Sequence, residues 1–446
     1  MRRALFLVVV MVLAGCNTAL GPQTATPTPI DSGNGTDPES DQLGWEAGYW
    51  YDESLPVTPE DGYNETERDA VVARTMARVE VVRQLEFNES VPVEVISRAE
   101  YREQNSGGGN GSDAHRLWNN QVWEGLFLVG ERDDISQTFD DTLGSSVQGY
   151  YSPGKGEIIL VSDAPSPTID RTTLSHELVH ALQDQHFGLD GSPPTQDRQL
   201  ARNGIVEGDA MFVQHTYSSR CSDEWECLPK PESGSSGSGS GSGYNRGLFL
   251  TIYQPYATGG SFVATIQSRS GWEGVNDVYA NPPVSTEQVI HPTKYPDEKP
   301  VNVTVRDRST AEWQRFDVDP EADTVGEASI YAMLVSNGAV EPEDYYSYRS
   351  EASAGWAGDA LVPYQTDDER YGYVFRTTWD TREDATEFRD AYLKVLETHD
   401  AQARGDGVYV INESNPYGDA FRVSRSGKIV TVVNGPTVDD LDAIHE

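Results

Sequence analysis

Hydrophobic residues are spaced for helices in the first two thirds of the chain and mainly for strands in the last third. A spacing of three to four residues predicts an amphipathic helix, whereas alternation predicts a strand with one buried face. The helical spacings cover residues 64–87, 121–129, 134–143, 174–187 and 203–217. The alternating segments cover residues 91–97, 147–151, 157–162, 371–379, 407–411, 420–424 and 429–433, with one more helix at 382–397. The pattern therefore predicts an α+β protein, with a helix-rich domain at residues 45–300 and a smaller α+β domain at residues 301–446.

The predicted helix at residues 174–187 contains the pattern H-E-x-x-H, and Asp170 is suited to cap it. At about 100° per residue, its leucines gather on one side, while His176 and His180 fall on the other. Two imidazoles one turn apart can chelate one Zn²⁺, and a glutamate after the first can hold an attacking water. We therefore predict a zinc site with His176 and His180 as ligands and Glu177 as the catalytic base. Two surface histidines on an amphipathic helix are the alternative.

The N-terminus has the features of an export signal with a lipid anchor. Arg2 and Arg3 precede an apolar run, and the sequence L-A-G-C ends at Cys16, as in the lipobox of exported lipoproteins. The paired arginines leave both Sec and twin-arginine export open, and an ordinary signal peptide with an incidental cysteine is the alternative. We predict a signal peptide at residues 1–16, membrane attachment through a lipid on Cys16, and a mature protein on the outer face of the cell membrane.

Two polar segments interrupt the hydrophobic pattern. Residues 17–44 are predicted to be a flexible tether, and the Gly/Ser stretch at residues 231–243 a loop within the catalytic domain. Cys221 and Cys227 are predicted to form a disulfide outside the cell, because Cys16 is consumed by lipid. Six N-x-S/T patterns are candidate glycosylation sites: Asn34, Asn64, Asn88, Asn110, Asn302 and Asn412.

The charge of the chain is strongly negative: 72 acidic residues against 33 basic ones give a net charge of −39 at pH 7. Such a surface repels nucleic acid and anionic lipid, so we expect no nucleic-acid partner. In molar salt the Debye length falls to about 3 Å, which screens this self-repulsion while hydrated carboxylates keep the protein soluble. The composition therefore indicates a halophile. A calcium-binding surface is the alternative, although no D-x-D-x-D-G loop is present.

The pair H-E-L-V-H and V-E-G-D-A resembles the gluzincin metallopeptidases, whose third zinc ligand is a glutamate on a second helix. The longer stretches H-E-L-V-H-A-L-Q-D-Q-H-F and E-G-D-A resemble a family of uncharacterised exported proteins, most closely haloarchaeal surface lipoproteins. The likeness spans about residues 65–400 and takes in residues 149–151, 283–295, 355–359 and 379–381. By this resemblance, Glu207 is the third metal ligand.

The same resemblance implies a zincin-like catalytic domain, in which a sheet edge above the H-E-x-x-H helix pairs with an extended peptide. Gluzincins often carry an aspartate four residues after the ligand glutamate, to orient a histidine. This chain has Met211 there, so Asp209 or Asp184 would take that role. His291, at the end of a short predicted helix capped by Ser285, is a candidate donor to the oxyanion of the reaction. The helix dipole alone is the alternative explanation for a histidine at that position.

Together these features predict a membrane-tethered, extracellular zinc metallopeptidase with one Zn²⁺ ion and a peptide or protein substrate. Zinc would activate a water, and Glu177 would pass its proton to the leaving amine. The main alternative is a non-catalytic surface or adhesion protein with a structural metal. A metal-dependent hydrolase of non-peptide bonds is a third possibility. The sequence leaves open the oligomeric state and the role of residues 301–446.

Overall fold

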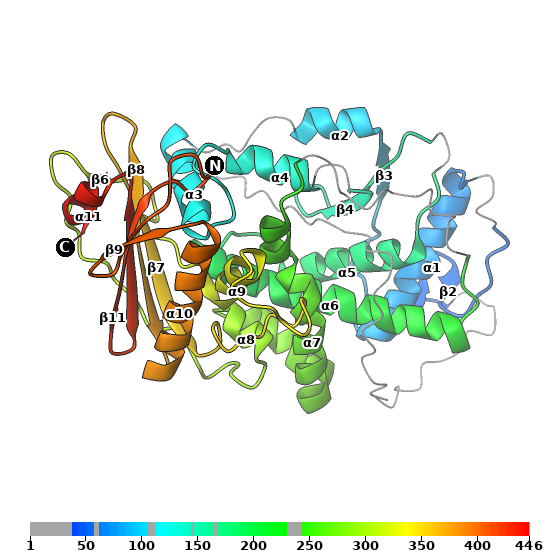
Figure 1. The fold of residues 1–446 in the computed structure, drawn as a ribbon. Coiled ribbons are helices and arrows are strands. Elements are labelled where there is room, and N and C mark those ends of the chain that lie inside the picture. The colour runs from blue at the N-terminus through cyan, green and yellow to red at the C-terminus, as the bar shows by residue number, and fades with distance from the viewer. Residues whose placement is uncertain are drawn as a thin grey trace.

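The structure is a computed structural model, and it describes residues 38–57, 62–105, 112–143, 147–164, 167–229 and 243–445. The predicted signal peptide with Cys16, residues 17–37 of the tether, residues 231–242 of the Gly/Ser loop, and Asn34 and Asn110 lie outside the described residues. The protein has the predicted α+β class, with a helical region and a sheet region (Figure 1). Within the described ranges, no helix combines the length and hydropathy needed to cross a membrane.

The helical region begins with a capped helix and a small sheet. Helix α1 (Glu65–Arg83) starts at a capping box formed by Asn64 and Glu67. Three strands form a sheet in the order β3 (Val93–Ile96), β5 (Glu157–Val161), β4 (Gly149–Ser152). Strand β3 is parallel to β5, and β4 is antiparallel to it. The alternating segments at residues 147–151 and 157–162 therefore form a hairpin, and β4 is one edge of the sheet.

Three long helices form the centre of the helical region (Figure 1). Helix α5 (Arg171–Phe187) contains the H-E-x-x-H pattern, and it is followed by α6 (Gln196–Asp223) and α7 (Arg246–Ala280). Helices α6 and α7 approach so closely that a Cβ on Gly208 would lie 2.4 Å from the carbonyl carbon and oxygen of Gly259. A residue with a side chain at either position would collide with backbone, so both positions require glycine.

An antiparallel sheet of seven strands forms the other region, in the order β6-β7-β8-β12-β11-β10-β9. The strands are β6 (Gln314–Arg315), β7 (Trp356–Gln365), β8 (Tyr371–Trp379), β9 (Gln402–Gly405), β10 (Val408–Val410), β11 (Ala420–Ser426) and β12 (Ile429–Gly435). Helix α10 (Arg382–Thr398) packs on one face beside Phe375, and α11 (Val438–Ile444) packs on the other beside Val374 (Figure 1). The alternation of Val374 and Phe375 between the two faces follows from the strand pleat.

The core of the sheet region draws on both halves of the sequence. Helices α3 (Asp113–Gly125) and α9 (Gly326–Ser336) bury Trp118 and Met333 in the same cluster as Phe375. This core therefore extends across residue 300, where the sequence suggests a domain boundary. The remaining short elements are β1 (Trp45–Glu46), β2 (Tyr49–Trp50), α2 (Arg98–Asn105), α4 (Ile135–Leu143) and α8 (Thr286–Ile290).

Buried carboxyl groups lie where the two regions meet, at the point where the Asp197 N–H donates to the Thr324 carbonyl oxygen at 2.9 Å. Asp197, in the first turn of α6, accepts hydrogen bonds from the backbone N–H and the hydroxyl of Thr286 at 2.8 and 2.6 Å. Asp359 of β7 accepts from the N–H groups of Val325 and Gly326, each at 2.9 Å. Burial raises the pKa of Asp197 to about 8 and that of Asp359 to about 6, although these hydrogen bonds oppose the shift. Both groups therefore change their charge in the neutral pH range.

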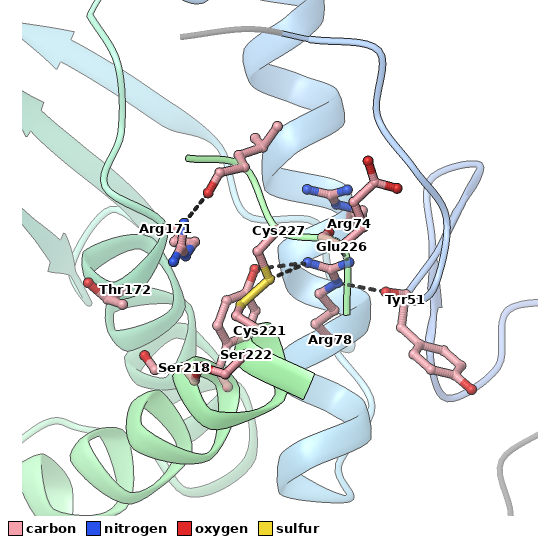
Figure 2. Close-up of a disulfide and its surroundings, with 12 residues drawn as sticks. Tyr51, Arg74, Arg78, Arg171, Thr172, Ser218, Cys221, Ser222, Glu226 and Cys227 are labelled. Carbon is pink, nitrogen blue, oxygen red and sulfur yellow. Dashed lines mark hydrogen bonds between the residues drawn. A yellow bond between two sulfur atoms is a disulfide. The ribbon is translucent and has the colours of Figure 1, made fainter. Parts of the chain in front are cut away.

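Cys221 and Cys227 are joined by a disulfide at the C-terminal end of α6 (Figure 2). The buried guanidinium of Arg78, from α1, donates to the Cys227 sulfur at 3.3 Å. It also donates to the carbonyl oxygens of Glu226 at 2.9 Å and Tyr51 at 2.6 Å. One arginine thus connects α1, the disulfide loop and the segment before α1.

Candidate metal centre

Helix α5 is buried on its polar side as well as on its apolar side. Asp170 caps it by accepting hydrogen bonds from the N–H groups of Thr172 and Thr173 at 2.8 and 3.1 Å. Every residue from 173 to 183 is buried, because α1 packs on one side and α6 on the other. His176 and His180 are therefore interior residues, and the alternative of two surface histidines does not describe this structure.

Glu207 reaches the same interior position from α6, and its neighbours explain how. Gly204 and Gly208 flank it at the crossing with α7, where a Cβ on Gly259 would lie 2.4 Å from the Gly204 carbonyl oxygen. Because the two backbones are in contact here, the position of α6 is fixed at the turn that carries Glu207. The E-G-D-A motif thus combines a carboxylate with the glycine that permits the close crossing.

Three side-chain atoms converge between α5 and α6. The Nε2 atoms of His176 and His180 lie 3.2 and 3.4 Å from the same Oε2 of Glu207. For a tetrahedral zinc site with bonds of about 2.0 Å, neighbouring ligand atoms are separated by about 3.3 Å. The Nε2 of His180 has no hydrogen-bond partner among the described residues. The donor set, the spacing and this unsatisfied nitrogen all fit a divalent metal ion.

The charges at this position are strongly coupled. Burial alone would raise the pKa of Glu207, but the charge on His180 and the hydrogen bond with His176 lower it to about 2. Burial would likewise lower the pKa of His180, but the Glu207 carboxylate raises it to about 9. A proton on the imidazole thus balances the carboxylate when no cation does so, and a metal ion would displace that proton.

Glutamines, and not the aspartates expected from the sequence, bind the outer nitrogens of the two histidines. The Nδ1 of His176 lies 2.9 Å from Oε1 of Gln214, and the Nδ1 of His180 lies 2.9 Å from Oε1 of Gln183. The amide of Gln183 is oriented by its own donation to the Val206 carbonyl at 2.9 Å. Each Nδ1 is therefore a donor, which leaves Nε2 as the coordinating atom.

The two aspartates have other partners, so the expectation that one of them orients a histidine is wrong. Asp209 accepts two hydrogen bonds from Arg83, at 2.9 and 3.0 Å. Asp184 accepts from the Tyr151 hydroxyl at 2.9 Å. Both carboxylates stabilise the packing around the site, because they link α5 or α6 to neighbouring elements.

Glu177 is completely buried next to the edge of the small sheet. Its Oε2 accepts a hydrogen bond of 2.7 Å from the backbone N–H of Tyr151 in β4. Its Oε1 has no partner in the part of the chain that the structure describes. Burial raises the pKa of Glu177, although the nearby imidazoles oppose the shift. A buried carboxylate with one free oxygen is chemically suited to accept a proton.

Tyr256 of α7 is a further residue at the site that the sequence did not predict. Burial, together with the negative charge of the Glu207 carboxylate, raises the pKa of its phenol well above the usual value. Its ring stacks on the imidazole of His176, with centroids 6.3 Å apart and planes at 15°. A tyrosine 80 residues away from the H-E-x-x-H pattern has no local sequence signal, because only the helix crossing brings it close.

His291 is not part of this cluster. It caps the C-terminus of α8, and its Nε2 lies 3.1 Å from Oε1 of the buried Glu327. A second acidic group, formed by Glu287, Glu298 and Asp380, is bound by Lys294 at 2.6, 2.6 and 3.5 Å. Its charge is already balanced by that lysine, so we assign no metal to it.

Comparisons with known proteins concern only the sheet region. Residues 314–445 match a family model described as a domain of unknown function (DUF8575). The match contains the seven-stranded sheet and leaves the three converging side chains outside it. Neither a curated protein nor a solved structure matches the chain.

Proposed function

We propose that the protein is an extracellular zinc metallohydrolase, and specifically a gluzincin-like peptidase. The observation that carries this proposal is the convergence of His176 Nε2, His180 Nε2 and Glu207 Oε2, at the separations of three zinc ligands. Three protein ligands leave a fourth position open, as in catalytic zinc sites. Glu177 lies next to the first ligand in sequence and has one free carboxylate oxygen.

The position of β4 supports a zincin-like arrangement. This strand is the edge of its sheet and contacts α5, the helix with both histidines. The Tyr151 N–H points away from β5 and donates to Glu177. An extended peptide beside this edge would bring its backbone close to the base, which is how peptides add to exposed strands.

In the proposed reaction, Zn²⁺ held by His176, His180 and Glu207 would lower the pKa of a water to about 7 and polarise the scissile carbonyl. Glu177 would accept the proton from the attacking water at Oε1 and deliver it to the leaving amine. Gln183 and Gln214 would hold the imidazoles in the required tautomer. Tyr256 would hold the His176 imidazole in place through the stacking of its ring.

One observation favours a second candidate, a surface protein with a structural metal. His176, Glu177, His180 and Glu207 are exposed by only 2, 0, 0 and 4%. A structural zinc site is normally closed in this way. Such a protein would bind zinc at the same residues and would hydrolyse nothing.

Two variants separate these possibilities when zinc content and peptide hydrolysis are measured on each in molar salt. We expect Glu177→Gln to keep zinc and to lose activity by about 10²–10⁴-fold, because the amide cannot accept the proton. We expect Glu207→Gln to lose zinc, because a neutral amide is a poor ligand. Zinc in the wild type without chelator-sensitive hydrolysis would favour the structural candidate. Zinc retained by Glu207→Gln would contradict the ligand set.

We further propose that the protein is tethered to the outside of a halophile's membrane by a lipid on Cys16. The L-A-G-C sequence and the net charge of −39 support this proposal. Cys16→Ala is expected to release the protein into the medium, as measured by fractionation. A variant that stays in the membrane fraction would contradict the lipid anchor.

A further inference from the structure

Exposed apolar side chains are concentrated beside α7. In the part of the chain that the structure describes, five large apolar residues are clearly exposed, and three of them are Tyr244, Tyr345 and Tyr346, at 40, 40 and 37%. Tyr244 immediately precedes α7, and the other two lie between α9 and β7. We call these three residues the tyrosine patch. The other two, Val301 and Val438, are single exposed residues elsewhere.

A row of stacked rings connects this patch to the candidate metal centre. Along α7, Phe249 stacks on Tyr253 with centroids 5.2 Å apart, and Tyr253 stacks on Tyr256 at 5.9 Å. Tyr256 in turn stacks on His176 at 6.3 Å. Tyr346 contacts the middle of the row through Tyr253, with centroids 5.2 Å apart. The spacing of four and then three residues keeps the three α7 rings on one face of the helix.

The side of the candidate metal centre that faces the aromatic row of α7 is the side nearest to solvent. The three ligand candidates are almost fully buried, whereas Gln214 and Tyr256, which contact them from α6 and α7, are partly exposed. Tyr253, one step further along the row, is also partly exposed. The side chains are thus buried at His176, partly exposed at Tyr256 and Tyr253, and exposed at Tyr346.

We infer that the tyrosine patch and the aromatic row of α7 bind an extended polypeptide that carries aromatic or large aliphatic side chains, and direct it to the metal centre. This inference rests on the proposed function and names its substrate class. Tyrosine and arginine are enriched where proteins bind polypeptides, because they combine apolar contact with hydrogen bonding. Arg246 completes the patch, with its guanidinium carbon 4.5 Å from the centre of the Tyr345 ring.

The charge and the ring geometry favour a polypeptide over other occupants of this surface. A net charge of −39 repels nucleic acid and acidic peptides, so a peptide without net negative charge fits best. Within the row, neighbouring rings lie nearly parallel, with interplanar angles of 15, 9 and 15°. Their faces are thus occupied by one another and are not open for a sugar ring or a base to stack on. Ring edges and hydroxyl groups remain, and these suit side chains and backbone amides of a peptide.

The test measures peptide binding to the mature chain carrying Glu177→Gln, which removes turnover. Two dye-labelled decapeptides are compared by fluorescence anisotropy in molar salt: one with alternating Phe and Ser and two Lys, and one with every Phe replaced by Ser. We expect the Phe peptide to bind about tenfold more tightly, since one anchored ring is worth about 1.4 kcal/mol. Adding Tyr346→Ala is expected to remove this preference, whereas Tyr346→Phe and the distant Val438→Ala keep it.

Hydrolysis by chains with an intact Glu177 gives an independent readout. We expect Tyr346→Ala to raise KM for the Phe peptide by about tenfold and to leave kcat nearly unchanged, because the ring binds substrate far from the reacting bond. Equal hydrolysis of both peptides, with no effect of Tyr346→Ala, would overturn the inference and leave the proposed function intact. Selective binding without any hydrolysis would overturn the proposed function instead. Binding of a neutral oligosaccharide in place of both peptides would overturn the inference.

Discussion

Helices α5 and α10 have the same length, 17 residues, and both have a capped N-terminus, yet they pack in different ways. Helix α10 buries one stripe, which includes Phe388 and Tyr392, against the sheet and exposes its charged residues to water. Helix α5 buries an unbroken run of residues, including two histidines and a glutamate. A polar face in water needs no protein partners, whereas a buried polar face needs a partner for every atom.

This difference distinguishes the helix of the proposed site without reference to any motif. Most buried polar atoms on α5 have partners, such as Gln183 and Ser175. Among the described residues, three on α5 have an unpartnered buried atom: Arg171 at its start, Glu177 and His180. Oε1 of Glu177 and Nε2 of His180 lie where the proposed chemistry needs a base and a metal ligand. The lesson is that unsatisfied atoms on a buried polar face carry more functional information than the polarity of the face itself.

The largest expected difference in stability is between the loss of a buried ion pair, Arg83 with Asp209, and the loss of an exposed one, Arg389 with Asp390 on α10. Arg83 and Asp209 are exposed by 1 and 0%, whereas Arg389 and Asp390 are exposed by 32 and 54%. We expect Arg83→Ala to lower the free energy of unfolding by about 3–5 kcal/mol, because it leaves a buried carboxylate unpaired. Arg389→Ala is expected to change it by less than about 0.5 kcal/mol. Denaturant unfolding in molar salt measures both, and a similar small change for both variants would invalidate the comparison.

A smaller effect is expected where α6 crosses α7 beside Glu207. A Cβ at Gly259 would collide with the Gly204 carbonyl oxygen at 2.4 Å, whereas a Cβ at Gly260 would meet its nearest side chain, that of Met211, at 3.7 Å. Gly259→Ala is therefore expected to cost about 1–3 kcal/mol and to weaken zinc binding. Gly260→Ala is expected to stabilise the helix by about 0.5–1 kcal/mol and to leave zinc unaffected. Unfolding curves and zinc titrations on the two variants test this, and equal behaviour would show that the crossing does not set the position of Glu207.

A further effect, spread over several pH units, is a pH dependence at the buried junction of the two regions. The folded pKa of Asp197 is raised from 3.8 to about 8, chiefly by burial. Between these values the folded chain holds a proton that the unfolded chain has lost, so stability decreases as the pH rises towards 8. One such proton contributes a slope of at most about 1.4 kcal/mol per pH unit. Asp197→Asn is expected to flatten the curve of unfolding free energy between pH 5 and 8, and an unchanged slope would show that this carboxyl group is ionised in the folded protein.

Several helices and strands could be predicted closely from hydrophobic spacing, because this pattern depends only on residues within the same segment. Strand β8 covers residues 371–379, as predicted, because the segment is rich in aromatic and β-branched residues and contains no proline. Strand β7 was missed, because Gly358 and Pro363 interrupt its pattern. The packing of α3 against the sheet was also missed, since the apolar stripe of a helix does not specify which surface it covers.

Two of the three converging side chains follow directly from spacing, because His176 and His180 are one turn apart on one helix. Glu207 could be named only from a resemblance to known peptidases, and its place in the cluster depends on the contact between α6 and α7. Gln214 and Tyr256 could not be predicted, because they reach the site only through the crossing of α5, α6 and α7. The angle at which helices cross cannot be read from the spacing of residues along one helix.

The arginine at the disulfide has a consequence for how this protein tolerates its ionic surroundings. The hydrogen-bond acceptors of Arg78 are two carbonyl oxygens, a phenol oxygen and a sulfur, none of which carries a formal charge. Dissolved ions weaken attraction between exposed charges, but they have little access to a buried dipole. Exposed ion pairs, such as that of Arg389 and Asp390, weaken at high salt concentration. The hydrogen bonds of Arg78, which connect α1 to the disulfide loop and to the segment before α1, are expected to depend little on salt concentration.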